Sequence, residues 1–136
     1  MDAAQVFSHL NWLAILVAAL TGFPIGGVWY GPLFGRAWMT ASGVTRGTGE
    51  QNPVKLYGTV LVLNLIIATS LAMFIGPNGN WQAGLFAGFM AGFTFVAMAL
   101  GVTYLFESRP LKLWLINAGY QVILFTVMGV ILGAWH

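Results

Sequence analysis

The chain has 136 residues, of which 59% are hydrophobic and 6% are charged, whereas soluble domains carry roughly 25% charged residues. Four membrane spans of about 20 residues and their connections would fill this length, which excludes an independent soluble domain, including a catalytic one. The net charge is +2, and because the bases are scattered over two loops they do not form a nucleic-acid surface.

Four apolar stretches predict an all-α membrane protein, built as a bundle of four transmembrane helices. A helix rises about 1.5 Å per residue, so each stretch can cross about 30 Å of hydrocarbon. Asn52-Pro53 and Asn80 are N-cap signals for the second and third helices. The predicted spans, which form a single transmembrane domain over residues 1–136, cover residues 10–31, 54–75, 81–105 and 111–134.

The connections between the predicted spans differ in length and charge. Gly76-Pro77-Asn78-Gly79 makes a short turn after the second span, whereas the connection after the first span continues to about residue 52. All five bases lie in the two connections opposite that turn: Arg36, Arg46, Lys55, Arg109 and Lys112. Because positive residues in short loops stay in the cytoplasm, we expect a short outer turn, one longer cytoplasmic loop, and both termini outside the cytoplasm.

Small residues recur every four positions along the predicted spans. Gly84, Gly88 and Gly92 form two overlapping GxxxG motifs in the third span, so one side of this helix is nearly flat. In lipid, such faces associate helices through van der Waals contact. Two interpretations stay open: the small residues pack the four spans against one another, or at least one such face forms the interface of a homo-oligomer.

Each predicted span carries one polar residue near its middle: Thr21, Asn64, Thr94 and Gln121. An unpaired amide or hydroxyl is costly in hydrocarbon, so these side chains should face the bundle interior. They either form interhelical hydrogen bonds or line a polar constriction for water or a small neutral solute. Asn117 and Tyr120, one turn closer to the cytoplasm, would extend either feature.

No group of residues identifies an enzyme or a cofactor site. No Asp, Glu, Lys, Arg or His is expected deep within a span, where ion-coupled transporters normally place one. The sequence has no cysteine, which removes thiolate metal ligands and cysteine nucleophiles. His9 and His136 alone would make a weak metal site. We therefore expect no catalytic residues, no cofactor and no metal.

Charged residues gather at the cytoplasmic boundary, where Glu107 lies close in sequence to Arg109 and Lys112. We expect Glu107 to pair with Arg36 and so tie the two loops together. Alternatively, the bases bind anionic lipid headgroups, and both roles can hold at once.

Several segments resemble the domain of unknown function 1761 family, and the resemblance extends over essentially the whole chain. They are Asn11-Trp12-Leu13-Ala14, Gly27-Val28-Trp29-Tyr30-Gly31-Pro32-Leu33-Phe34-Gly35-Arg36-Ala37-Trp38-Met39, Leu105-Phe106-Glu107-Ser108-Arg109-Pro110, and Gly119-Tyr120 with Gly129, Gly133, Ala134 and Trp135. The resemblance implies a small protein of the bacterial inner membrane with four spans, and it implies no activity. We interpret Trp29, Tyr30, Arg36 and Trp38 as an anchoring motif at the membrane interface.

The leading hypothesis is a non-enzymatic membrane protein that forms a homo-oligomer or serves as an accessory subunit of a larger membrane complex. Its other partners would be membrane lipids, and not nucleic acid. The alternative is a passive conduit or binding site for a small neutral or lipidic molecule, and an enzyme acting at the membrane surface comes third. The mid-span polar residues discriminate between the first two, because an accessory protein should bond them internally and a conduit should leave them wet.

Overall fold

The computed structural model describes residues 10–43 and 52–135, and secondary structure in these residues is entirely helical. Two of the spans contain a π-helical segment, labelled η. The elements are α2 (Trp12–Leu20), α3 (Gly22–Val28), η1 (Trp29–Leu33), α4 (Gly35–Ser42), α5 (Pro53–Ile75), α6 (Trp81–Met90), η2 (Ala91–Ala97), α7 (Met98–Phe106) and α8 (Leu111–Ala134). Three sequence features lie outside the described residues: Arg46, His9 and His136.

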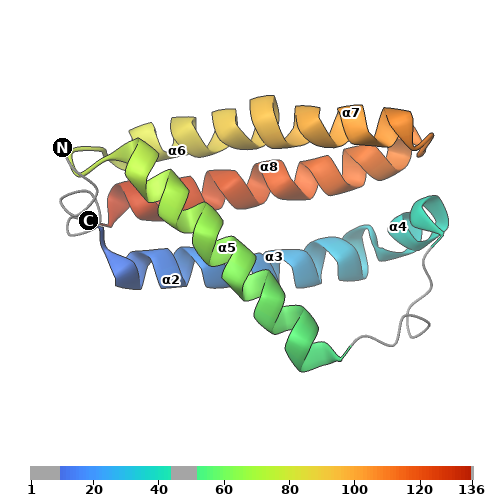
Figure 1. Cartoon of the computed structure of the whole chain (residues 1–136), viewed down its shortest axis with the longest axis horizontal. Helices are drawn as coiled ribbons and strands as arrows, with labels where there is room; N and C mark the ends of the chain where they lie inside the picture. The colour runs from blue at the N-terminus through green and yellow to red at the C-terminus, as the bar shows by residue number, and fades with distance from the viewer. Residues whose placement is uncertain (1–9, 44–51, 136) are drawn as a thin grey trace.

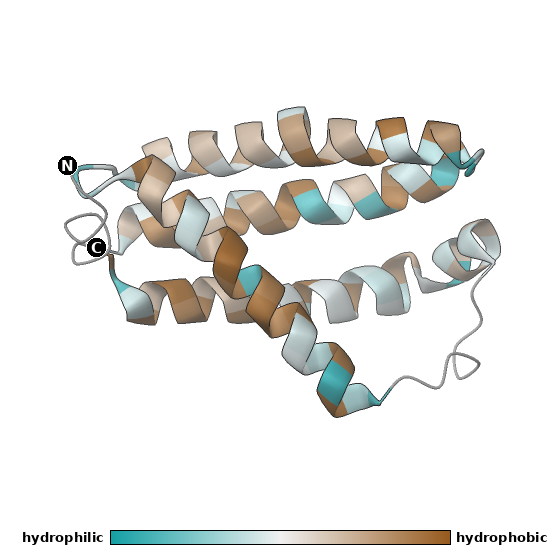
Figure 2. Ribbon diagram, viewed as in Figure 1, coloured by the Kyte–Doolittle hydropathy of each residue, from teal (hydrophilic) through white to brown (hydrophobic). Residues whose placement is uncertain are grey.

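Four continuous helices are long and apolar enough to cross a membrane: Trp12–Leu33, Pro53–Ile75, Trp81–Phe106 and Leu111–Ala134. Their outward surfaces are apolar as well, since Phe74, Phe95 and Leu105 are 83%, 73% and 81% exposed. Figure 2 shows mainly hydrophobic residues along these helices, with hydrophilic ones near some helix ends and at isolated positions within α5 and α8. So large an exposed apolar surface is unfavourable in water, whereas it is favourable in the hydrocarbon of a bilayer. The chain is a multi-pass membrane protein, and the predicted four-helix fold is confirmed.

Local signals in the sequence set the helix ends. The Asn52 side chain accepts hydrogen bonds from the first backbone N–H groups of α5, and the Asn80 side chain accepts one from Ala83 at the start of α6. Both predicted caps are therefore confirmed. Gly76 ends α5 with a φ of 80°, a conformation that glycine adopts without strain. Within the first span, α2 ends at Leu20, whose carbonyl cannot bond to the ring nitrogen of Pro24.

The four spans run alternately up and down. Figure 1 shows the span containing α6 and α7, then α8, then the span containing α2 and α3, lying side by side, with α5 crossing them obliquely. The start of α2, the turn after α5 and the end of α8 lie at one end of the molecule. We call the opposite end, which carries α4 and the turn between α7 and α8, the basic end. The core is built mainly from small and aliphatic residues, among them Ala14, Ala18, Ala68, Leu124 and Met128.

Candidate functional site

Glycines hold the third span against α8 in the half of the bundle away from the basic end. Gly84, Gly88 and Gly92 are buried against α8 of the same chain. A Cβ added to Gly84 would overlap the Gly129 carbonyl, and one added to Gly88 would overlap the Phe125 carbonyl. The predicted GxxxG face therefore packs within the chain, which is the first of the two interpretations that the sequence left open.

The π-helical segment η2 extends this small-residue face toward the basic end. After Gly92, the next small residues at the α8 contact are Ala97, which is 2% exposed, and Gly101, where a Cβ would lie 3.2 Å from Trp114 Nε1. In a regular α-helix five residues turn by about 500°, which would carry Ala97 off the face. The wider turn of the π-helix accommodates the extra residue and keeps Ala97 toward α8.

Toward the basic end, hydrogen-bonded aromatic side chains join the helices. The Tyr30 hydroxyl donates to Asn117 Oδ1 over 2.7 Å, and Asn117 Nδ2 donates to the Tyr104 hydroxyl over 2.8 Å. The Tyr120 ring lies 5.3 Å from that of Tyr30, and its hydroxyl donates to the Gly22 carbonyl over 2.9 Å. We call these four residues the tyrosine–asparagine cluster. It joins the first, third and fourth spans.

Two tryptophans join helices in the same half of the bundle, and both do so in the same way. Trp29 Nε1 donates to the Ile116 carbonyl over 2.8 Å, and its ring lies 3.0 Å from where a Cβ on Gly119 would be. Trp114 Nε1 likewise donates to the Ala97 carbonyl over 2.8 Å, beside Gly101. In each case a glycine leaves room for the indole ring to reach a backbone carbonyl of another helix. A buried indole N–H needs such an acceptor.

Comparison with known families identifies the chain. The model of the family described as protein of unknown function (DUF1761) matches residues 13–133. The chain belongs to this family. No curated protein and no solved structure matches it. The family description names no activity, so the function of this DUF1761 member has to be argued from its own residues.

The mid-span polar residues of this DUF1761 protein do not meet in one place. Thr21 and Thr94 donate to carbonyls of their own helices, at Ala18 and Met90. Asn64 is 6% exposed and donates to the Ala19 carbonyl on α2 over 3.3 Å. Gln121 is half-buried, and within the described residues its side chain makes no hydrogen bond. Every buried side-chain nitrogen and oxygen of the described residues has a partner.

The four residues of the expected anchoring motif divide into two pairs. Trp29 and Tyr30 point into the bundle and bond to α8. Arg36 is exposed in the first turn of α4, and Trp38 is half-buried, with its ring 5.7 Å from Tyr30 in an edge-on contact. The segment therefore holds α4 and η1 against α8.

The expected pairing of Glu107 with Arg36 is wrong. Glu107 Oε1 accepts from Arg109 Nε over 2.7 Å, two residues along the chain. Ser108, which lies between the two residues in the turn from α7 to α8, has a φ of 57°. The Arg109 guanidinium also lies 5.5 Å from the centre of the Tyr104 ring, a cation–π contact next to the tyrosine–asparagine cluster.

Among the side-chain amides of this DUF1761 protein, Asn117 should be the one whose substitution lowers stability most. Asn117→Leu removes both bonds of the amide and leaves the Tyr30 and Tyr104 hydroxyls to find new partners, so we expect a loss of about 1–2 kcal/mol of unfolding free energy. Gln121→Leu is the matched control, one turn away on α8, and should change stability by less than about 0.5 kcal/mol. Unfolding by SDS in mixed micelles measures both. Equal losses would contradict a special role for Asn117.

Proposed function

We propose that the protein is a non-catalytic subunit of the bacterial inner membrane that assembles with a second copy of itself through α5. The first, third and fourth spans use small residues for contacts within the chain, as Gly22, Gly88 and Gly129 illustrate. Helix α5 differs, because one outward face carries a hollow. An accessory role in a larger complex would use the same face for a different membrane helix.

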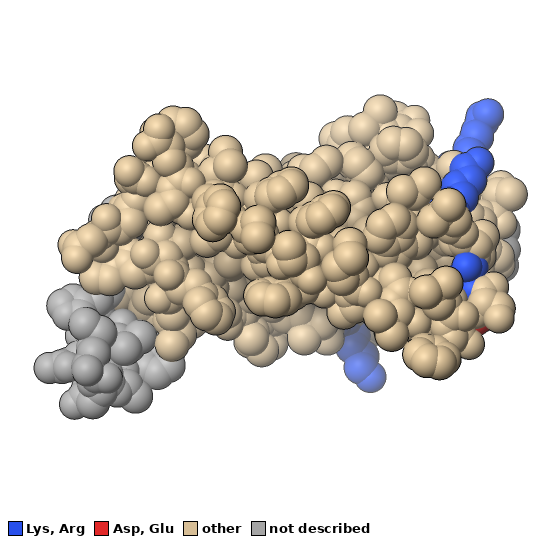
Figure 3. Space-filling model, turned by 90° about the horizontal axis from the view of Figure 1, so that it is seen from above, with Lys and Arg blue, Asp and Glu red and all other residues tan. Residues whose placement is uncertain are grey.

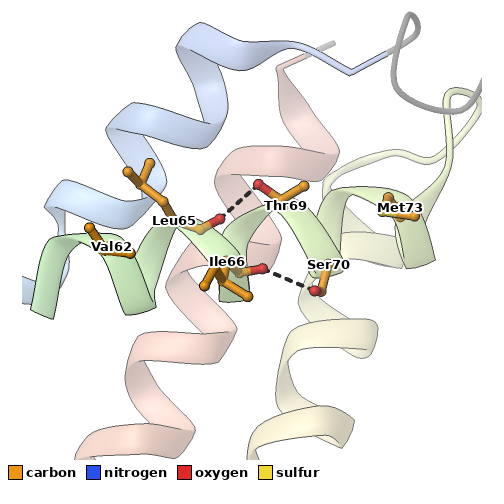
Figure 4. Close-up of a pocket in the computed structure, with 6 residues that line it drawn as sticks. All are labelled: Val62, Leu65, Ile66, Thr69, Ser70 and Met73. Atoms are coloured by element: carbon orange, nitrogen blue, oxygen red, sulfur yellow. Dashed lines mark hydrogen bonds between the residues drawn. The ribbon is translucent and has the colours of Figure 1, made fainter. Parts of the chain in front are cut away.

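The observation that supports this proposal is a shallow groove of about 360 Å³ along α5. Figure 4 shows its lining residues on one side of the helix: Val62, Leu65, Ile66, Thr69, Ser70 and Met73. The Thr69 hydroxyl donates to the Leu65 carbonyl over 2.7 Å, and the Ser70 hydroxyl donates to the Ile66 carbonyl over 2.9 Å. Both donors are therefore satisfied without water. The small side chains leave a depression beside larger neighbours, into which a ridge of a second helix can pack.

The alternative, a passive conduit, has less support. A conduit needs polar side chains that line one continuous path. Thr21 and Thr94 instead satisfy their hydroxyls within their own helices, and the Asn64 amide donates to a neighbouring backbone carbonyl. This arrangement favours a packed structural protein.

The proposed orientation places the basic end in the cytoplasm and both termini outside it. Arg36 follows the first span and Arg109 lies between the third and fourth, while Lys55 and Lys112 lie in the first turns of the second and fourth. Figure 3 shows Lys and Arg side chains within one half of the molecule's length. The positive-inside rule relates this asymmetry to the inner leaflet.

Cysteine cross-linking tests the proposed dimer, and the chain has no native cysteine to interfere. Ser70→Cys places a thiol in the α5 groove, and we expect disulfide-linked dimers after oxidation in lipid vesicles. Phe86→Cys is the control, because Phe86 is 64% exposed on α6 and lies about as many residues from the same end of its span. It should stay monomeric.

Native mass spectrometry from nanodiscs gives the second readout. Dimers that are lost on Ser70→Trp, a variant that fills the groove, would support the α5 interface. A monomer in nanodiscs together with equal cross-linking at both thiols would overturn the proposal. A mass that corresponds to one copy plus a different protein would point to the accessory role and would also overturn the self-association.

A further inference from the structure

Gln121 carries an amide without a protein partner near the middle of α8. Within the described residues this amide makes no hydrogen bond, whereas every buried side-chain nitrogen and oxygen there has a partner. The amide of Gln121 is therefore not sealed inside the protein but accessible from outside it. An amide that meets only hydrocarbon is strongly unfavourable, so a hydrogen-bonding group has to reach it.

Gln121 lies on the inward face of α8 and not on the face toward lipid. Its neighbours on the adjacent turns, Ala118, Leu124 and Phe125, are all buried, and residues three and four positions apart share one face of a helix. Ile123, which is 39% exposed, points about 200° away from Gln121. The accessible amide of Gln121 therefore faces the interior of the bundle.

The interior is open on the side of Gln121 toward the basic end. Asn117, four positions nearer that end, is half-buried, as Gln121 is. Side chains on a helix lean toward its N-terminus, which for α8 is the basic end, so the Gln121 amide reaches toward Asn117. On the other side of Gln121 the same face continues with Leu124 and Met128, which are both buried. The open part of the face therefore ends at Gln121.

Helix α5 explains why only one half of this face is closed. Residues 52–59 are all exposed, and the first buried residue of α5 is Asn64. Ala68, one turn further on, belongs to the same core cluster as Leu124 and Met128. Figure 1 shows the corresponding oblique course of α5 across the other spans. The half of α8 nearer the basic end is therefore left without cover from α5.

Polar side chains continue from Gln121 to the basic end. Asn117 donates to the Tyr104 hydroxyl over 2.8 Å, which leaves the proton of that hydroxyl for another acceptor. Tyr104 is half-buried, and its ring lies 5.5 Å from the guanidinium of Arg109, which is exposed in the turn before α8. Hydrogen-bonding groups therefore extend from the surface at Arg109 to the middle of the membrane.

We propose that the face of α8 from Asn117 to Gln121 is an internal water-binding site, which fills from the basic end and is closed beyond Gln121. The amides and the Tyr104 hydroxyl offer donors and acceptors without charge, which suits a small neutral molecule, and water is available at the basic end. Because the site is a dead end, it is not the conduit considered above. It is also separate from the α5 groove around Ser70 and does not require the dimer.

Thiol accessibility tests the site, and the chain has no native cysteine. Gln121→Cys should react with a membrane-impermeant methanethiosulfonate reagent, because the reagent attacks the thiolate and apolar surroundings suppress the thiolate. Ile123→Cys is the matched control at nearly the same depth on the lipid-facing side, and should react at least about tenfold more slowly. Leu124→Cys, on the closed part of the inward face, should be equally slow. A rate for Gln121→Cys no higher than that of Ile123→Cys would overturn the site.

The side of entry is tested in membrane vesicles of both orientations. Lys112→Cys, which is exposed at the basic end, reports the side that this end faces, and Gln121→Cys should react from the same side. Reaction from the opposite side, or at equal rates from both, would contradict a dead end that opens at the basic end. All variants should label fully after denaturation in SDS, which shows that each thiol is present. Gln121→Leu should not change cross-linking through Ser70→Cys, so failure of the water site and failure of the proposed dimer are distinguishable.

Discussion

Gly88→Ala should destabilise the protein by about 3 kcal/mol, in the upper part of the range for overpacked cores. The new methyl group would overlap the Phe125 carbonyl, which belongs to the α8 backbone and cannot turn aside as a side chain can. Helices α6 and α8 would have to separate. That movement would also loosen the contacts of Gly84 with Gly129 and of Gly133 with Asn80 on the same helix pair, so one methyl group weakens the whole interface.

Gly58→Ala is the matched control for this change. Gly58 also lies within a membrane-spanning helix, but a Cβ there meets no atom within 4 Å. Alanine is favoured over glycine in a helix, so this variant should be neutral or up to about 1 kcal/mol more stable. Both free energies can be measured by SDS titration in mixed micelles with circular dichroism. Similar losses at the two positions would show that the α6–α8 contact is not the source of the effect.

The predictable parts of this fold are those that depend on short stretches of sequence. The third span was expected over residues 81–105, and the helix runs from Trp81 to Phe106. The fourth was expected over residues 111–134, and its bounds are Leu111 and Ala134. Span length follows from the thickness of hydrocarbon, and helix starts follow from local caps such as Asn80. Neither requires knowledge of which helices touch.

The partner of a flat helix face is harder to predict, because spacing shows that a face exists and does not show what covers it. The glycines of the third span fit both intrachain packing and a homo-oligomer, and the register that places Gly84 against Gly129 is a property of two distant segments. The mid-span hydroxyls illustrate a second limit. A threonine can satisfy itself on its own helix, as Thr21 and Thr94 do, so equal depth does not bring such residues together.

The tyrosine–asparagine cluster could have been found with a stricter argument about hydroxyl groups. Tyr30 was expected at the membrane interface, where water or headgroups satisfy a phenol. Its hydroxyl and that of Tyr104 instead meet at Asn117. The available signal was that Asn117 offers both a donor and an acceptor at a depth near that of two tyrosines. The sequence could suggest that meeting, but only the crossing of three helices produces it.

The π-helical segment η2 leads to a second prediction with a large expected effect. Along the third span the small residues that face α8 are separated by four, four, five and four positions: Gly84, Gly88, Gly92, Ala97 and Gly101. The interval of five coincides with η2. One extra residue in the π turn therefore compensates for the irregular spacing.

Deleting Phe95 should consequently be tolerated. Phe95 lies within η2 and is 73% exposed. Its removal shortens the spacing between Gly92 and Ala97 from five positions to four. A regular α-helix would then keep Ala97 and Gly101 toward Trp114. We expect the deletion to cost less than about 2 kcal/mol of unfolding free energy, because no buried contact is removed. Deleting Phe86, which is 64% exposed on α6, removes the same kind of residue outside the π segment.

The Phe86 deletion should instead abolish folding or cost more than about 4 kcal/mol. It rotates the start of α6 by about 100° and turns Gly84 away from Gly129. SDS unfolding, followed by circular dichroism, compares the two deletions. If deleting Phe95 proves as damaging as deleting Phe86, then η2 does more than correct the spacing. Its wide turn would then be required in itself, and the bond from Trp114 to the Ala97 carbonyl at its end would be the first contact to examine.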